Sequence, residues 1–262
     1  MIKKYLIIFI TVIGFSFNAF AGNDGELLLK KNNPSEVKDC FEGVNRATFA
    51  FNQGLDKIIF KPVATVYRVL PKPVRSGVSN SLDNLSNLVT IPNNILQGDF
   101  KKAGTNTGRF IINTTIGILG IFDAADAIGL PEYEKEDYGQ SLAKMGMGPG
   151  CYLVLPVLGP STVRDATGSI ANFVGGDAWY NVTVRNDTQH FEDVHYYTSK
   201  VMAGVDFRAK NYNEIENLEK NSIDFYSSVK SLYLQNRQQK ILNSKQITNT
   251  QNDSDWEEID TQ

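Results

Sequence analysis

Long stretches of helical apolar spacing, none of them long enough to cross a bilayer, are the feature that most restricts the fold of this chain. Large apolar residues recur at three- and four-residue steps, which predicts helices, over Phe41–Leu70, Ser79–Phe100, Lys101–Phe122 and Asn213–Leu242. Pro62 predicts a kink or a new helix start, and Pro92 predicts an interruption. The third stretch is apolar on more than one face, as in a helix buried in a core or placed in lipid. The fold class is therefore mainly α.

A glycine-rich segment interrupts this helical pattern. Eight of the 21 glycines fall within residues 139–176, and the run Met145–Gly150 is followed by the apolar stretch Tyr152–Pro156. This order predicts a tight turn and a short strand or hairpin. The glycines 146, 148 and 150 do not fit a phosphate-binding loop, because no Lys-Ser/Thr pair follows them.

The first 21 residues have the pattern of a signal peptide. Lys3 and Lys4 precede the apolar run Leu6–Phe17, and Ala19-Phe-Ala21 supplies the small residues of a cleavage site. The alternative is an anchor that stays in the membrane, but the run is short against the roughly 20 residues that a spanning helix needs. We expect cleavage after Ala21 and a mature chain that works outside the cytoplasm.

The remaining boundaries follow from composition. Residues 22–39 are polar and lack apolar periodicity, so they are expected to form an N-terminal linker. Residues 40–242 carry the helical pattern and form the predicted domain. Residues 243–262 hold few large apolar groups and five acids, which predicts a disordered acidic tail.

Composition excludes several classes of function. A net charge of −3 gives no support for a nucleic-acid binder. The chain has two histidines and two cysteines, too few for a three-histidine or four-thiolate metal site. His190 and His195 are five residues apart, which does not match the four-residue spacing of helical zinc ligands. Ser161 near Asp165 lacks a nearby histidine, so a serine hydrolase has little support.

The two cysteines, Cys40 and Cys151, both lie in the exported chain. An even number of cysteines in an oxidising compartment is consistent with a disulfide. Two buried free thiols fit the same composition, and the residues alone leave both alternatives open.

A series of ordered motifs covers roughly residues 39–240. The blocks are Asp39-x-Phe41-Glu-Gly43-x-Asn45-Arg46, Phe49-Ala-Phe51-Asn52, Lys61-Pro-Val-Ala64, Leu96-Gln-Gly98, Gly108-Arg109-Phe-Ile-Ile-Asn113-Thr114, Asp137-Tyr-Gly-Gln140 and Tyr152-Leu-Val-Leu-Pro156. Together they resemble the MlaA/VacJ family of outer-membrane lipid-asymmetry components.

The resemblance implies a ring-like helical bundle with a short glycine-rich hairpin, set in the inner leaflet of the outer membrane on its periplasmic face. It implies a phospholipid transporter with a central amphipathic channel, whose partners are a glycerophospholipid, an outer-membrane porin and a periplasmic lipid carrier. Such transport makes and breaks no bond, so neither an enzyme nor a cofactor is expected. The alternatives are a phospholipase-like hydrolase using Ser161 or an acid pair, and a structural protein associated with porins.

Two departures from the family accompany the resemblance. Members commonly carry a lipid anchor, whereas this sequence has an A-x-A site and no lipobox cysteine. At positions 40 and 151 the family usually has proline, and here both positions are cysteine. Because both prolines are replaced in the same way, we predict a disulfide between Cys40 and Cys151.

The resemblance also selects candidate site residues. A lipid channel or membrane seat is predicted from Phe41, Asn45, Phe49, Phe51, Asn52, Arg109 and Asn113. The alternative for Asn45 is a structural role, because buried amides often support a neighbouring element. A gate beside the channel mouth is predicted from Gly146, Gly148, Gly150 and Tyr152, with an ordinary surface hairpin as its alternative.

Overall fold

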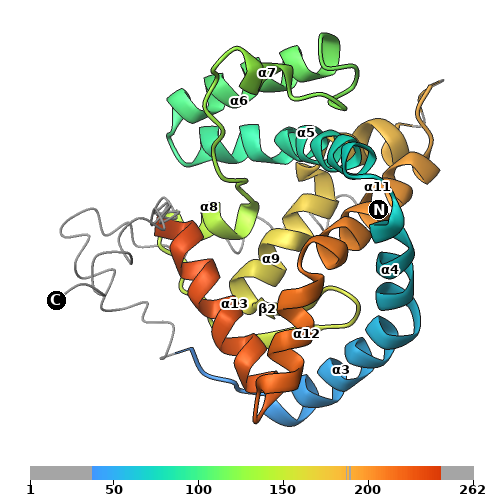
Figure 1. The fold of residues 1–262 in the computed structure, drawn as a ribbon. Coiled ribbons are helices and arrows are strands. Elements are labelled where there is room, and N and C mark those ends of the chain that lie inside the picture. The colour runs from blue at the N-terminus through green and yellow to red at the C-terminus, as the bar shows by residue number, and fades with distance from the viewer. Residues whose placement is uncertain (1–36, 187, 189, 243–262) are drawn as a thin grey trace, which may run out of the picture. The chain divides into compact units, whose positions relative to one another are not determined.

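The computed structural model, shown in Figure 1, describes residues 37–186, 188 and 190–242. The predicted signal peptide, most of the predicted linker and the predicted acidic tail lie outside these residues. The described part is mostly helical and contains one short hairpin, in agreement with the predicted class.

The first helical stretch consists of three consecutive elements. α3 (Glu42–Leu55) continues through the π-helical turn η2 (Asp56–Phe60) into α4 (Lys61–Val69), as the blue-to-cyan ribbon of Figure 1 shows. Pro62 lies in the first turn of α4, directly after the π-helical turn. The helical hydrogen-bond pattern changes here, because proline has no backbone N–H to donate. The backbone turns to an extended conformation at Leu70 and Pro71, and the next helix begins there.

α5 (Lys72–Leu96) is a continuous helix with Pro92 inside it, so the predicted interruption at Pro92 is wrong. A proline in a helix interior costs about 3 kcal/mol. Here the flanking amides hold the last turns in place. Asn93 accepts from the Ser141 hydroxyl at 2.6 Å, and Asn94 accepts from the Asn106 side chain at 2.8 Å.

α6 (Phe100–Thr115) begins where the Asp99 side chain accepts from the backbone N–H of Lys102. It ends seven residues before the predicted boundary at Phe122, because residues 116–122 form a loop. Ile118 and Leu119 have φ values of 52° and 56°, outside the helical region. Gly117 allows the chain to fold back here, since a Cβ at this position would lie 2.2 Å from the carbonyl oxygen of Phe122.

The middle segment contains α7 (Ala124–Ala127), α8 (Tyr138–Lys144) and the hairpin. Strands β1 (Tyr152–Leu155) and β2 (Gly159–Thr162) pair antiparallel, with Tyr152 opposite Thr162. The turn between them is residues 156–158, so the glycine-rich run 145–150 precedes the hairpin and does not form its tip. Gly146 and Gly150 have φ values of 96° and 68° and let the chain change direction between α8 and β1.

The C-terminal part is helical. Its elements are α9 (Val163–Ala171), η3 (Asn172–Gly176), α10 (Ala178–Tyr180), η4 (Asn181–Arg185), α11 (Asp193–Lys210), α12 (Tyr212–Asn221) and α13 (Phe225–Leu242). The single stretch predicted over residues 213–242 is two helices, because Ser222 is extended at φ −82°, ψ 136°. α11 was not predicted from the sequence.

Packing joins elements that are distant in sequence. α5 lies along α6, α8 along α9, α11 against α4 and α5, and α13 against α8 and β2. Two small apolar clusters are buried. One joins α4 to α11 through Ala64, Tyr67, Val205 and Ala209, and the other joins β1 to α13 through Tyr152, Val154, Tyr226 and Leu234.

Candidate functional site

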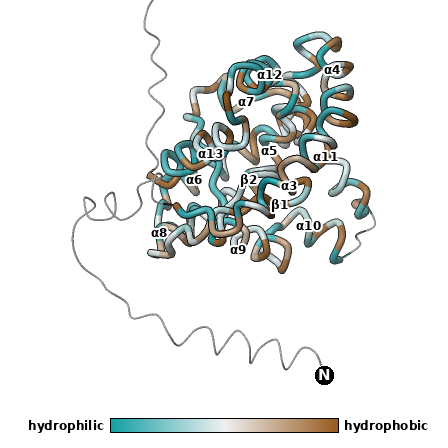
Figure 2. The backbone as a smooth tube through the Cα atoms, turned by 90° about the horizontal axis from the view of Figure 1, so that it is seen from below, coloured by the Kyte–Doolittle hydropathy of each residue, from teal (hydrophilic) through white to brown (hydrophobic). Residues whose placement is uncertain are grey.

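The surface of the described residues is unusually apolar and the interior unusually polar. Asn93 and Asn94 are fully buried, whereas Ile58, Phe100 and Leu119 are 70–77% exposed. Figure 2 shows hydrophobic residues spread through the coloured part of the backbone, with α4 and α10 among the elements that carry them. Buried polar groups and large exposed apolar patches are the informative exceptions to normal burial. This distribution fits a protein whose surroundings are partly apolar. In the described residues, no helix is both long and apolar enough to cross a bilayer.

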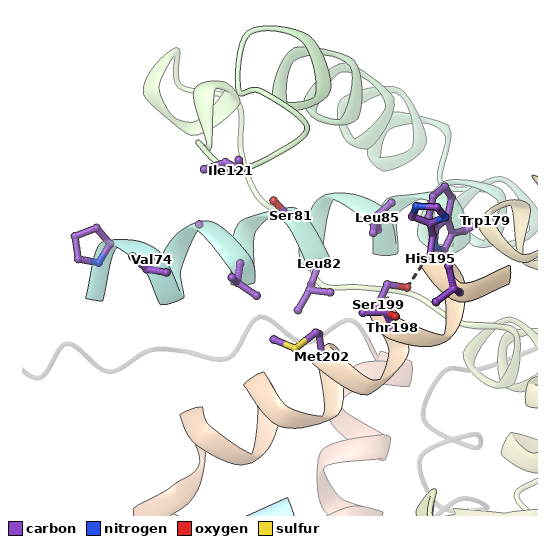
Figure 3. Close-up of a pocket in the computed structure, with 14 residues that line it drawn as sticks. Val74, Ser81, Leu82, Leu85, Ile121, Trp179, His195, Thr198, Ser199 and Met202 are labelled. Atoms are coloured by element: carbon purple, nitrogen blue, oxygen red, sulfur yellow. Dashed lines mark hydrogen bonds between the residues drawn. The ribbon is translucent and has the colours of Figure 1, made fainter. Parts of the chain in front are cut away.

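A groove of about 780 Å³ lies between α5 and α11. Its walls are mainly apolar and come from Pro73, Val74, Gly77, Val78, Leu82 and Leu85 of α5, Val194 and Met202 of α11, and Ile121 and Trp179. Leu82 and Met202 face each other across it in Figure 3. An elongated, mostly apolar cavity of this size suits a flexible apolar chain.

A few polar groups lie at the Trp179 end of this groove. The indole N–H of Trp179 donates to the Ser199 hydroxyl at 3.2 Å, and that hydroxyl donates to the Tyr196 carbonyl at 2.7 Å. Nδ1 of His195 accepts from the backbone N–H of Glu192 at 2.9 Å. The groove therefore combines apolar walls with one polar end, which is the pattern that an amphiphile requires.

The opposite face of α5 forms a closed polar seam with α6. Besides the Asn94–Asn106 pair, the Asn84 amide donates to the Thr114 hydroxyl at 2.9 Å, and all three asparagines are buried. Bonds of this kind satisfy polar groups that would otherwise cost free energy in an apolar interior. The seam fixes α5 on α6 and leaves the α11 side of α5 open as the groove wall.

Arg109 and Asn113, predicted to line a channel or seat the protein, are buried clamps on the segment after α6. Arg109 donates to Asp123 and to the Leu130 carbonyl, both at 2.6 Å, and Asn113 donates to Asp123 at 3.0 Å. Burial alone would raise the pKa of Asp123, but the hydrogen bond from Asn113 and the charge of Arg109 outweigh it and lower the pKa. Both side chains hold structure and do not line the groove.

The predicted residues of α3 divide into two groups. Asn45 is buried, and its amide donates to the Tyr152 carbonyl and accepts from the Val154 N–H. Asn52 bonds in the same way to the Leu155 carbonyl and the Val157 N–H. These contacts correspond to the structural alternative for Asn45 and correct the prediction that the two amides meet lipid or channel water.

The three phenylalanines of α3 also differ. Phe49 packs edge-on against Phe225 and Tyr226, so it belongs to the core cluster. Phe41 and Phe51 are 55% and 54% exposed. Only these two have the exposure that a membrane seat requires.

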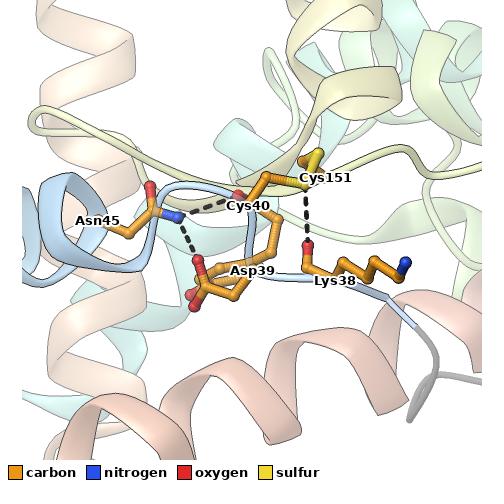
Figure 4. The surroundings of a disulfide bond; sticks show 6 residues. Lys38, Asp39, Cys40, Asn45 and Cys151 are labelled. Atoms are coloured by element: carbon orange, nitrogen blue, oxygen red, sulfur yellow. Dashed lines mark hydrogen bonds between the residues drawn. A yellow bond between two sulfur atoms is a disulfide. The ribbon is translucent and has the colours of Figure 1, made fainter.

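Cys40 and Cys151 form a disulfide with their Cα atoms 5.6 Å apart, as Figure 4 shows. Next to it, the N–H of Tyr152 donates to the Lys38 carbonyl at 2.9 Å. Asp39 accepts from Asn45 at 2.7 Å and from Lys230 at 3.2 Å. The last residues of the predicted linker therefore belong to the folded domain, which begins by residue 37.

The predicted gate residues lie apart from the groove walls. Tyr152 is fully buried between Tyr226 and Tyr233, and burial raises the pKa of its hydroxyl. Its side chain is core and is not available to a lipid. Gly148 is exposed, and nothing lies within 4 Å of a Cβ built on it, so this part of the run 145–150 has space to change.

Ser161 lies in a separate polar cavity of about 230 Å³. Its hydroxyl donates to the Thr162 carbonyl, and no residue lining the cavity is a histidine. Burial alone would raise the pKa of Asp165, but the charges of Arg237 and Arg164 and the hydrogen bonds from Arg237 and Tyr233 hold it below its usual value. A carboxylate that is paired in this way is a poor general base, so the cavity lacks the parts of a serine hydrolase. In the described residues, no group of three His, Cys, Asp or Glu side chains is placed to hold a metal ion.

The groove was not predicted from the sequence, although a signal for it was present. Val194, Thr198 and Met202, which line the groove, recur at four-residue steps along the stretch that forms α11. The apolar positions Val74, Val78, Leu82 and Leu85 mark the facing stripe of α5. Sequence spacing identifies such stripes but does not say which two of them lie opposite each other.

Comparison with known proteins gives a consistent result. Residues 37–240 match the family model described as MlaA lipoprotein. A solved structure from work on the "Structural basis for maintenance of bacterial outer membrane lipid asymmetry" superposes with a TM-score of 0.65 at 31% identity. That match covers 76% of this chain and 97% of the other.

Sequence relatives cover the chain to different extents. A Haemophilus influenzae protein named intermembrane phospholipid transport system lipoprotein MlaA is 31% identical over 225 residues, which are 81% of this chain and 83% of the relative. A Rickettsia felis protein without an assigned function is 41% identical over 141 residues, 53% of this chain and 56% of the relative. The chain thus spans about half the length of the first curated relatives it matches.

Proposed function

The chain belongs to the MlaA lipoprotein family, and from this premise we propose that it is a phospholipid transport component that helps to maintain outer-membrane lipid asymmetry. Mislocalised glycerophospholipid would pass from the outer membrane, through this protein, to a periplasmic lipid carrier. The observation that carries the proposal is the groove between α5 and α11, with apolar walls and a polar end.

The physical task explains this arrangement. A phospholipid that leaves a leaflet must keep its tails away from water and its headgroup away from hydrocarbon, where unsatisfied polar groups cost several kcal/mol each. Apolar walls such as Leu82 and Met202 would hold a tail. The Thr198 hydroxyl at the polar end would donate to ester or phosphate oxygens, because the proton of Ser199 is already donated to the Tyr196 carbonyl.

Location and partners follow from the same proposal. The exposed apolar side chains, Phe41 and Phe51 among them, would place the protein against the inner leaflet of the outer membrane on its periplasmic side. An outer-membrane porin and a soluble lipid carrier are the proposed protein partners. We propose no catalytic role, since transfer of an intact lipid needs no nucleophile.

The test fills the groove. Leu82→Trp and Met202→Trp add bulk between α5 and α11, and each variant should still fold. A deletion strain that carries either variant should keep more phospholipid in its outer leaflet than the same strain complemented with wild type. Val69→Trp is the matched control, because Val69 is 82% exposed on α4 outside the groove. Folded groove variants that restore asymmetry as well as wild type would contradict this site.

A second measurement separates transport from the hydrolase alternative. Phospholipid that co-purifies intact with the protein supports transport. Fatty acid released from added phospholipid, and lost in Ser161→Ala, would support hydrolysis instead. A porin that co-purifies while lipid neither binds nor moves would favour the purely structural alternative.

A further inference from the structure

The loop between α6 and α7, residues 116–122 and here called the apolar loop, exposes more apolar surface than its length requires. It contains no charged and no polar side chain. Its exposed large residues are Ile116 (72%), Ile118 (58%), Leu119 (71%), Ile121 (44%) and Phe122 (61%). In a loop surrounded only by water, every one of these side chains would be unfavourably placed.

The backbone of the apolar loop is strained. Ile118 and Leu119 are consecutive non-glycine residues in the left-handed region, at φ 52° and 56°. This region is rare for large side chains, and for a β-branched residue such as isoleucine it is an outlier. Such strain persists only where the surrounding structure fixes it, and it is concentrated at functional positions.

The surrounding structure does fix this loop. Six backbone N–H groups, those of residues 116, 117, 119, 120, 121 and 122, donate to carbonyl oxygens between residues 112 and 118. The Asn80 side chain donates to the Ile121 carbonyl at 3.2 Å. Gly120 lies directly on Asn84, since a Cβ there would be 2.7 Å from that side chain. The apolar loop is therefore rigid and exposes its apolar side chains. Its backbone N–H groups already have hydrogen-bond acceptors within the protein.

The loop is continuous with the groove. Ile121 is one of the residues that line it and lies beside α5 in Figure 3. Its Cγ2 atom is 3.1 Å from the position that a Cβ would occupy on Gly77. An acyl chain that follows the surface of the loop would therefore reach the groove at Ile121.

We propose that the apolar loop is a preformed wedge that enters the acyl region of a phospholipid leaflet and passes lipid tails to the groove beside Ile121. Its occupant is the leaflet itself, because the loop offers no charge or hydrogen-bonding side chain to a protein partner and is continuous with an acyl-sized groove. The satisfied backbone N–H groups reduce the cost of contact with hydrocarbon. This inference rests on the proposed function and adds the point at which lipid enters.

The test exploits the strain. Asparagine tolerates the left-handed conformation better than leucine or isoleucine. Leu119→Asn and Ile118→Asn should therefore keep or raise the melting temperature of the full chain. They should weaken sedimentation with phosphatidylethanolamine/phosphatidylglycerol vesicles by about tenfold, because an apolar side chain no longer enters the leaflet. Ile223→Asn is the matched control, since Ile223 is fully exposed in the α12–α13 connection.

Insertion depth gives an independent measurement. The added indole of Leu119→Trp should be quenched by phospholipid brominated in its acyl chains, and that of Ile223→Trp should not. Equal quenching of the two, or Leu119→Asn that sediments with vesicles as strongly as wild type, would overturn the proposal. If Leu119→Asn still bound vesicles but no longer co-purified with a porin, the proposal would also be wrong, and the apolar loop would instead bind a protein partner.

The design separates this inference from the function on which it rests. If wild type restores asymmetry and Leu119→Asn does so equally well, the wedge is wrong and transport stands. If wild type binds no lipid and the groove variants have no effect, the proposed function fails, whatever the vesicle result for the loop.

Discussion

Asn45 and Asn52 lie seven residues apart on α3 and bind backbone groups of the hairpin that lie three residues apart. Asn45 bonds to the Tyr152 carbonyl and the Val154 N–H, and Asn52 to the Leu155 carbonyl and the Val157 N–H. Two helical turns advance about 10.5 Å, and the three residues from Tyr152 to Leu155, which lie within β1, advance about 10 Å. Because these lengths match, the two amides can both bond to the free edge of β1. They supply backbone hydrogen bonds there that a third strand would otherwise make.

The first prediction concerns this pairing. Asn45→Leu would leave the Val154 N–H and the Tyr152 carbonyl buried without their amide partner, at a cost of about 1–3 kcal/mol for each unsatisfied group. We expect a clearly lower midpoint in thermal or urea unfolding followed by circular dichroism. Ala47→Leu, at an exposed position of α3, should have little effect. If the Asn45→Leu protein were as stable as wild type, the structural role would be wrong, and the alternative that the Asn45 amide meets lipid or channel water would be favoured.

The disulfide gives the second prediction. The bridge joins residues 111 apart and should stabilise the fold by about 4–5 kcal/mol through the entropy of the unfolded chain. The Cys40→Ser/Cys151→Ser double variant should lose up to this amount in urea unfolding. Dithiothreitol should lower the wild-type midpoint and leave the double variant unchanged. A reducing agent that shifts both proteins equally would show that the bridge is not the cause.

The gate proposed for residues 145–150 can be tested with two glycines that differ in their surroundings. Gly150 has a φ of 68°, and a Cβ there would lie 2.9 Å from Val163, so Gly150→Ala should cost about 1–2 kcal/mol through strain. Gly148 has open space around it, so Gly148→Ala should fold normally. Slower lipid transfer by stable Gly148→Ala would support the gate. Unchanged transfer would leave an ordinary surface segment.

Acid should destabilise the protein through Asp165. Its pKa is lower in the folded protein than in the unfolded chain, so it contributes stability above the unfolded value of about 3.9, and this stability disappears as the pH falls through the folded pKa. We expect the melting temperature to drop below about pH 4. Asp165→Asn should lose about 3 kcal/mol at pH 7 and show a shallower acid limb. Asp83→Asn, at an exposed site, should keep the wild-type profile.

The sequence predicted those elements whose signals are local. Apolar spacing located most of α3 to α6, and Pro62 located the start of α4. The end of α6 was mistaken because residues 116–122 continue the apolar pattern. The departure from a helix is imposed by contacts of Gly117 and Gly120 that only the folded chain makes.

The candidate site was less predictable than the fold. Asn45, Asn52, Arg109 and Asn113 stand out in the sequence as polar groups among apolar ones, and this pattern suits a lining as well as a clamp. Their bonding partners decide between the two, and these lie up to 109 residues away. The groove depends on α5 and α11 lying opposite each other, which is a tertiary relationship that helical periodicity does not contain.

The bridge between Cys40 and Cys151 has one more consequence, which concerns topology. While it is closed, the main chain from residue 40 to residue 151 is a covalent ring that includes α3 to α8. A single protease cut anywhere within this ring opens it but releases nothing, and the two pieces stay together on a non-reducing gel. A cut after residue 151, between α9 and α13, does separate fragments. A single backbone cleavage between residues 40 and 151 therefore leaves the two fragments covalently joined as one molecule.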